Sequence, residues 1–71
     1  MELSARNQLS GSVTAITLGE VMADVTVDIG NGQTIAAAIT RGSVERLGLQ
    51  IGDDVVVIIK ATDVMVGKRT G

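Results

Sequence analysis

EVMADVTVDIGNGQTIAAAIT, residues 20–40, contains the clearest structural pattern of the chain. Up to Ile29, apolar and polar residues alternate, which predicts a strand with one buried and one solvated face. Gly30-Asn31-Gly32 then supplies residues that tolerate positive φ, as a hairpin loop requires. The alternation resumes from Gln33 to Thr40, so the whole stretch predicts a β-hairpin.

Shorter elements are predicted on both sides of this hairpin. Gly11 to Leu18 predicts an earlier strand with an irregularity near its middle. After the hairpin, Ser43 is placed to cap a short helix over residues 44–47. Gly48 stands where a helix commonly ends, because a glycine there adopts the left-handed conformation without strain.

The segment VVVIIK, residues 55–60, does not alternate. A strand that is apolar on both faces is typically buried on both faces. In a single small barrel the outer face would meet water, so we expect another subunit to cover it. Asp63 to Val66 predicts a last short strand, and residues 67–71 a flexible tail.

The predicted elements are five strands, with one short helix between the third and fourth. This order predicts an all-β fold, a five-stranded barrel of the OB type. The length predicts a single domain over residues 1–71. A chain of 71 residues is near the lower limit for folding alone. It has no Cys for disulfides, and without His or Cys a structural metal is disfavoured. Oligomerisation is the remaining way to stabilise so small a domain. The mean hydropathy of +0.39 also favours oligomerisation, because it indicates much apolar surface for a small domain.

Composition also excludes several classes of partner. The chain has no Phe, Tyr or Trp on which bases could stack, and its net charge is -2, so we expect no nucleic-acid partner. No stretch approaches the roughly 20 apolar residues of a membrane span, and the N-terminus lacks a signal-peptide pattern. We therefore expect no membrane partner and a cytoplasmic location.

Catalysis is not expected. The chain lacks His, Cys and Tyr, so nucleophile pairs of the Ser-His or Cys-His kind cannot form. Its acidic residues fall on predicted outer faces or turns, where solvated carboxylates are poor general acids. We also expect no catalytic cofactor.

Two isolated cations remain as candidates for binding. Arg6 has no acidic residue nearer than Glu2, and Lys60 ends the most apolar strand. Each, taken alone, is most simply a solvated side chain. Ser4, Thr40 and Thr62 add hydroxyl donors, and a dianion can be held by convergent neutral donors plus one or two cations. An acidic protein can therefore bind an anion at a local site.

Three segments give the chain a family resemblance: SARNQLSGSV (residues 4–13), AAITRGSVERLGLQIGDDV (37–55) and IIKATDVMV (58–66). They resemble the molbindins, the small molybdenum-pterin-binding proteins with a Mop or TOBE-like domain. The same module occurs in molybdate-responsive regulators and molybdate transporter ATPases. The resemblance covers nearly the whole chain and implies an OB-like barrel.

The resemblance also implies a ligand and an assembly. Free-standing molbindins are hexamers, trimers of dimers, that bind molybdate or tungstate at subunit interfaces. By the matching motifs, Ser4 and Arg6 of one subunit would meet Lys60 and the backbone N–H of Ala61 in a neighbour. Thr40 would be a further donor.

A second oxyanion site, near a three-fold axis, occurs around the first hairpin turn in some members of the family. Here it would involve Gly19, Glu20 and Val21, although the acidic Glu20 would oppose a dianion. Some members also carry a hydroxyl directly after the lysine. Ala61 stands there, so only its N–H can contribute.

Three functions follow as hypotheses. The first is an intracellular protein that binds molybdate or tungstate for storage or metal homeostasis. The second is a regulatory or oligomerisation module that acts through protein contacts in molybdate transport or sensing. The absence of a helix-turn-helix or nucleotide loop in 71 residues favours storage. The third, an OB-fold nucleic-acid binder, is disfavoured by the charge and the lack of aromatic residues.

Overall fold

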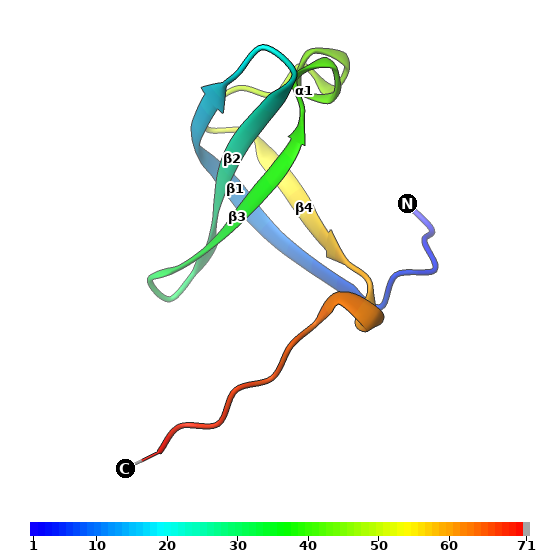
Figure 1. Cartoon of the computed structure of the whole chain (residues 1–71), viewed down its shortest axis with the longest axis vertical. Coiled ribbons are helices and arrows are strands. Elements are labelled where there is room, and N and C mark those ends of the chain that lie inside the picture. The colour runs from blue at the N-terminus through cyan, green and yellow to red at the C-terminus, as the bar shows by residue number, and fades with distance from the viewer. Residues whose placement is uncertain (71) are drawn as a thin grey trace.

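Four antiparallel strands form one sheet in the order β3-β2-β1-β4, as the computed structural model describes for residues 1–70 (Figure 1). An all-β fold with a helix after the third strand is thereby confirmed, while Gly71 of the predicted tail lies outside the described residues. In chain order the elements are β1 (Asn7–Leu18), β2 (Met22–Gly30), β3 (Gln33–Thr40), α1 (Arg41–Leu47), β4 (Asp54–Ile59) and the 3₁₀ turn η1 (Ala61–Asp63).

The predicted hairpin forms from β2 and β3. Gly30 pairs with Gln33, which leaves a two-residue loop with φ of 55° at Asn31 and 72° at Gly32. Positive φ at both positions is what the type I′ turn of a tight hairpin needs. The carboxylate of Asp28 accepts a hydrogen bond of 2.8 Å from the N–H of Gly30 and so fixes the entry to the loop.

Strand β1 is longer than predicted. It begins at Asn7 instead of Gly11, because its first half pairs with β4 while its second half pairs with β2. The predicted irregularity is confirmed as a register shift between Val13 and Ala15. The shift bends β1, so one strand can serve both halves of a strongly twisted sheet.

Helix α1 begins earlier than predicted, and its cap is Thr40 instead of Ser43. The Thr40 hydroxyl accepts a hydrogen bond of 3.0 Å from the Ser43 N–H. Gly42, a poor helix former, obscured the first turn in the sequence. The predicted end is confirmed, since Gly48 is left-handed with φ of 63°. With seven residues, α1 is the longest helix of residues 1–70, and none of them forms a helix that could span a membrane.

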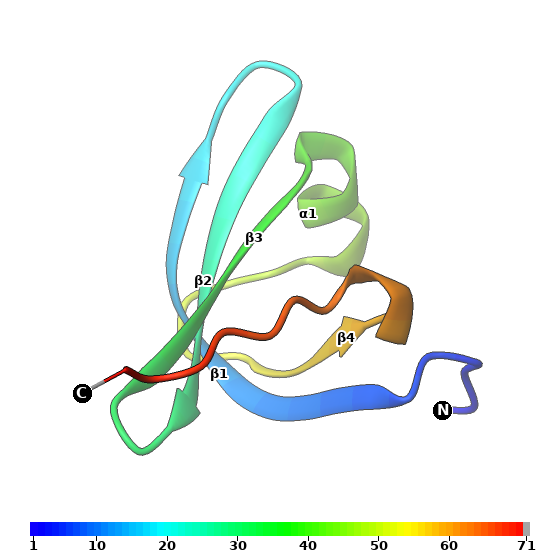
Figure 2. The same ribbon diagram turned by 60° about the horizontal axis from the view of Figure 1, so that its bottom comes forward.

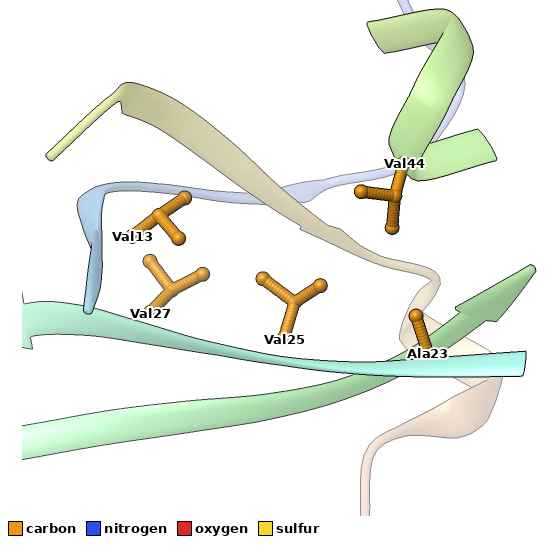
Figure 3. Packing of buried hydrophobic residues seen from close by; sticks show 5 residues of the cluster. All are labelled: Val13, Ala23, Val25, Val27 and Val44. Carbon is orange, nitrogen blue, oxygen red and sulfur yellow. The ribbon is translucent and has the colours of Figure 1, made fainter. Parts of the chain in front are cut away.

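A small valine-rich core lies between the two halves of the folded sheet. Val13 and Val27 are register partners, and their side chains face each other in Figure 3, with Val25 beside them and Val44 reaching in from α1. Fully burying a valine is worth about 1.5 kcal/mol or more. The five buried hydrophobic residues are Val13, Ala23, Val25, Val27 and Val44.

The predicted fifth strand, Asp63 to Val66, does not form within residues 1–70 of a single chain. Residues 61–63 form η1 instead, and the chain beyond leads away from the sheet (Figure 1). A strand requires a neighbouring strand, and within residues 1–70 this segment pairs with neither sheet edge. The described chain therefore has four strands, and it does not close into a barrel.

Strand β4 starts at Asp54 and ends at Ile59, one residue earlier at each end than predicted. Burial on both faces is not reached within one chain, because Val56 is 41% and Ile58 44% exposed. The other face, with Val55 and Val57, packs against the core. The outer apolar face of β4, Val56 and Ile58, is therefore exposed in the single chain.

Gly11 is essential for the close approach of β1 to β2. A Cβ placed on it would lie 2.5 Å from a Val27 methyl and 2.6 Å from the Asp28 carbonyl oxygen. We expect Gly11→Ala to lower the free energy of unfolding by about 1–3 kcal/mol, as overpacking does. Gly42→Ala is the matched control, since its Cβ would meet nothing within 4 Å, and it should be neutral or stabilising by up to about 1 kcal/mol. Urea denaturation at fixed protomer concentration would measure both, and equal effects would contradict this role of Gly11.

Candidate functional site

A surface hollow of about 200 Å³ lies where β1 begins and β4 ends. In Figures 1 and 2 the N-terminal segment and η1 lie next to each other at this end of the sheet. Two segments that are far apart in the sequence form its walls. We call it the Arg6–Lys60 hollow, and it is lined by Ser4, Ala5, Arg6, Lys60, Ala61 and Thr62.

The end of the β1–β4 ladder brings these two segments together. Asn7 and Ile59 form the last pair, so Arg6 and Lys60 are the next residues outward on the two strands. The side-chain amide of Asn7 donates a hydrogen bond of 3.1 Å to the Ile59 carbonyl oxygen. The two cations are therefore carried by backbone that sheet pairing holds side by side.

Local hydrogen bonds shape both walls of the hollow. The Gln8 amide donates to the carbonyl oxygen of Ala5 over 3.2 Å and folds the N-terminal segment against the start of β1. On the other side the Asp63 N–H donates to the Lys60 carbonyl oxygen over 2.9 Å and closes η1. This turn reverses the chain after β4, so Ala61 and Thr62 line the hollow instead of continuing the strand.

Neither cation has an acidic partner within the described chain. The single salt bridge of residues 1–70 joins Arg41 and Glu45, with 3.2 Å between Nε and Oε1. Arg6 and Lys60 therefore have no carboxylate within 4.0 Å to neutralise them there. Two positive charges around one hollow, without an internal counter-charge, favour an anion supplied from solution.

Neutral donors complete the hollow. Ser4 and Thr62 contribute hydroxyl groups, and the Ala61 N–H, at the first position of a 3₁₀ turn, has no partner inside that turn. Such a set can bind a tetrahedral oxyanion, whose several oxygens accept hydrogen bonds in different directions. A bare metal cation does not suit these donors, and residues 1–70 contain no group of three or more His, Cys, Asp or Glu that could hold one.

Of the predicted main site, the structure brings together Ser4, Arg6, Lys60 and Ala61 within a single chain. The family resemblance, by contrast, predicts that Ser4 and Arg6 come from one subunit and Lys60 and Ala61 from its neighbour. Thr40 does not line the Arg6–Lys60 hollow. It lies at the end of β3, where its hydroxyl is 2.7 Å from that of Ser43 and caps α1.

The predicted second site, Gly19 to Val21, forms the exposed turn between β1 and β2. Arg41 holds this turn from the start of α1: its N–H donates to the Val21 carbonyl oxygen over 2.8 Å, and its guanidinium to the Gly19 carbonyl oxygen over 3.3 Å. The structure thus keeps the three residues together and adds a nearby cation. Glu20 is exposed beside them.

Sequence reasoning missed part of the hollow. Thr62, a candidate hydroxyl donor in the sequence, is not among the site residues that the family resemblance implies. Ala5 lines the hollow too, and its methyl side chain gives no chemical signal in the sequence. The amide of Asn7 was missed too, because its partner is 52 residues away in the sequence. The available signal was the adjacency of Asn7 to Arg6 in the motif SARNQL.

Comparison with known proteins shows the family to which the chain is related. Residues 3–66 match the family model described as the TOBE domain. The "Probable molybdenum-pterin-binding protein" of Haemophilus influenzae is 46% identical over 67 residues, which are 94% of this chain and 97% of that protein. The family match over residues 3–66 includes both walls of the Arg6–Lys60 hollow.

Solved structures agree. A molybdate-binding protein from Sporomusa ovata superposes with a TM-score of 0.90 at 43% identity, covering 96% of this chain and all of that chain. ModG, described as a cytoplasmic molybdate-binding protein and solved with molybdate bound, gives a TM-score of 0.82 at 41% identity, over 86% of this chain and 43% of that one. From the family match and this full-length similarity, the chain belongs to the TOBE domain family, among its molybdenum-pterin-binding proteins.

Proposed function

We propose that this protein binds molybdate in the Arg6–Lys60 hollow, without catalysis, for storage or homeostasis of the metal in the cytoplasm. Tungstate is a second ligand, because both are tetrahedral dianions of nearly equal size. The observation that carries the proposal is the pair of cations without a carboxylate partner around one hollow, in a chain whose net charge is -2. The names of the Sporomusa ovata protein and of ModG support the choice of ligand and, for ModG, of compartment.

Each wall has a distinct part in this binding. The planar guanidinium of Arg6 can donate two parallel hydrogen bonds to two oxygens of one anion, while Lys60 acts as a compact point charge. Ser4 and the N–H of Ala61 donate neutral hydrogen bonds from the two walls. Charge neutralisation by Arg6 and Lys60 together matches the dianion, so the net charge of the protein does not prevent binding.

The working assembly in this proposal is a hexamer, a trimer of dimers, in which the barrel gains its fifth strand. An apolar groove of about 260 Å³ opens between β3 and β4, with Val13, Val25 and Ile39 among its lining. Both strands are free sheet edges. Residues 64–66 are apolar and exposed in the single chain: Val64 is 47% exposed, and Met65 and Val66 are each 93% exposed. In the proposed assembly, this segment of a second copy pairs as an added strand with a free sheet edge and buries its apolar side chains in the groove.

Isothermal titration of the assembled protein with molybdate, tungstate and sulfate tests the ligand. We expect saturable binding of molybdate and tungstate with similar affinities, because size and charge are alike. Sulfate should bind more weakly, since its oxygens lie closer to the central atom. Binding of sulfate as tight as that of molybdate would make the site a general oxyanion site. Absence of molybdate binding would leave the fold as a module that acts through protein contacts.

A further inference from the structure

The last pair of the β1–β4 ladder joins the two walls of the Arg6–Lys60 hollow. Beyond Asn7 the chain continues into the N-terminal segment, and beyond Ile59 it turns into η1. Strand ends fray readily when nothing holds them. The relative position of Arg6 and Lys60 thus depends on whether this pair stays closed.

Asn7 supplies an extra bond at this pair. Its Nδ2 donates to the Ile59 carbonyl oxygen over 3.1 Å, and the side chain is half-buried, in contrast to the exposed side chains of its neighbours Arg6 and Gln8. The bond fastens the residue before Lys60 to the residue after Arg6. A hydrogen bond shielded from water is held more firmly than an exposed one.

We propose that Asn7 is a positioning residue for oxyanion binding: its amide locks the end of the β1–β4 ladder and so holds Arg6 and Lys60 in register around one anion. This inference rests on the proposed function. It assigns Asn7 no contact with the ligand, because Asn7 does not line the hollow. Its effect on binding passes through the two cations on either side of the ladder.

A variant without the amide tests the proposal. Asn7→Leu keeps the approximate shape of the side chain and removes the donor. We expect titration with molybdate to show an affinity lower by about fivefold to tenfold. In the parent the end of the β1–β4 ladder is already closed before the anion binds. In the variant the ladder end must close during binding, and the free energy of closing it is lost from the affinity. Asn7→Ser keeps a shorter donor, should bind with intermediate affinity, and serves as the test variant if Asn7→Leu does not fold.

A double-mutant cycle with Arg6→Ala separates positioning from general destabilisation. Once Arg6 is absent, Asn7→Leu should cost less than twofold in affinity, because one of the two groups that it positions is gone. If Asn7→Leu lowers molybdate affinity by the same factor in the parent and in the Arg6→Ala variant, the proposal is overturned. General destabilisation of the fold would lower the affinity equally in both proteins.

Thr14→Val is the matched control. The Thr14 hydroxyl donates to the Thr26 carbonyl oxygen over 3.3 Å, which is also a side-chain bond across two paired strands, but away from the hollow. Its loss should leave molybdate affinity unchanged. If the parent binds molybdate and Asn7→Leu binds it equally well, the role of Asn7 is overturned while the proposed function stands. If the parent does not bind molybdate, the proposed function fails first.

Discussion

Arg6→Ala and Lys60→Ala should each lower the affinity for molybdate by about tenfold to a hundredfold. A charge-assisted hydrogen bond contributes roughly 1.5–3 kcal/mol net, and about 1.4 kcal/mol corresponds to a factor of ten in the dissociation constant. Both side chains line the same hollow without a carboxylate partner in the described chain, so neither has a structural ion pair to lose. The fold and the proposed oligomer should therefore persist, and the loss should appear in isothermal titration alone.

The chain offers a matched control for each cation. Lys68 and Arg69 are exposed residues of the C-terminal segment, outside the Arg6–Lys60 hollow. Replacing either by Ala removes the same charge from the protein but should leave affinity within about twofold, because exposed distant charges are screened by salt. If Arg6→Ala binds molybdate as tightly as the parent does, Arg6 is only a solvated side chain.

The double variant, Arg6→Ala with Lys60→Ala, should lose less binding free energy than the sum of the losses in the two single variants. Coupling of this kind is expected when two groups touch one ligand. Ser4→Ala should cost less than either charge, about 0.5–1.5 kcal/mol, because a neutral hydroxyl donates a weaker bond.

The second large effect concerns assembly. Val56→Asp should reduce the solution mass from several times 7.3 kDa to that of a smaller species. Val56 and Ile58 form the outer apolar face of β4. If the proposed neighbouring subunit covers this face, an unpaired carboxylate buried there costs several kcal/mol at every copy of the interface. Within one chain the position is 41% exposed, so the fold itself should tolerate the change.

Light scattering coupled to size-exclusion chromatography at micromolar concentration measures this mass. Gln33→Asp is the control, since it places the same new charge at an exposed position beside the hairpin loop. A parent protein that elutes at 7.3 kDa would contradict the assignment of this face to an interface.

Local chemistry explains which parts of the fold the sequence could predict. The β2–β3 hairpin combines alternation with a loop that has positive φ at Asn31 and Gly32, so neighbouring residues contain the whole signal. The first half of β1 carries no such signal, because its strand character comes from pairing with β4, whose paired residues are 42 to 52 positions away in the sequence. The segment after Asp63 is the opposite case. Its residues favour a strand, but it has no neighbouring strand to pair with in the described chain, and no strand forms there.

The same distinction applies to the site. Arg6 and Lys60 could be selected from the sequence because a cation without a nearby acid is visible in one dimension. That Thr40 would be occupied by the cap of α1 was not visible, since Ser43 is an equally good capping residue and Gly42 hides the first turn. The meeting of both walls within one chain depends on the end of a ladder, which only the three-dimensional structure defines.

Anomalous X-ray diffraction at the molybdenum absorption edge, from crystals grown with molybdate, tests the central assignment most directly, because it locates the metal atom. We expect a peak in the Arg6–Lys60 hollow, with oxygens of the anion within hydrogen-bond distance of the Arg6 guanidinium, the Lys60 ammonium and the Ala61 N–H. A peak confined to the turn at Gly19 to Val21, with none in the Arg6–Lys60 hollow, would contradict it.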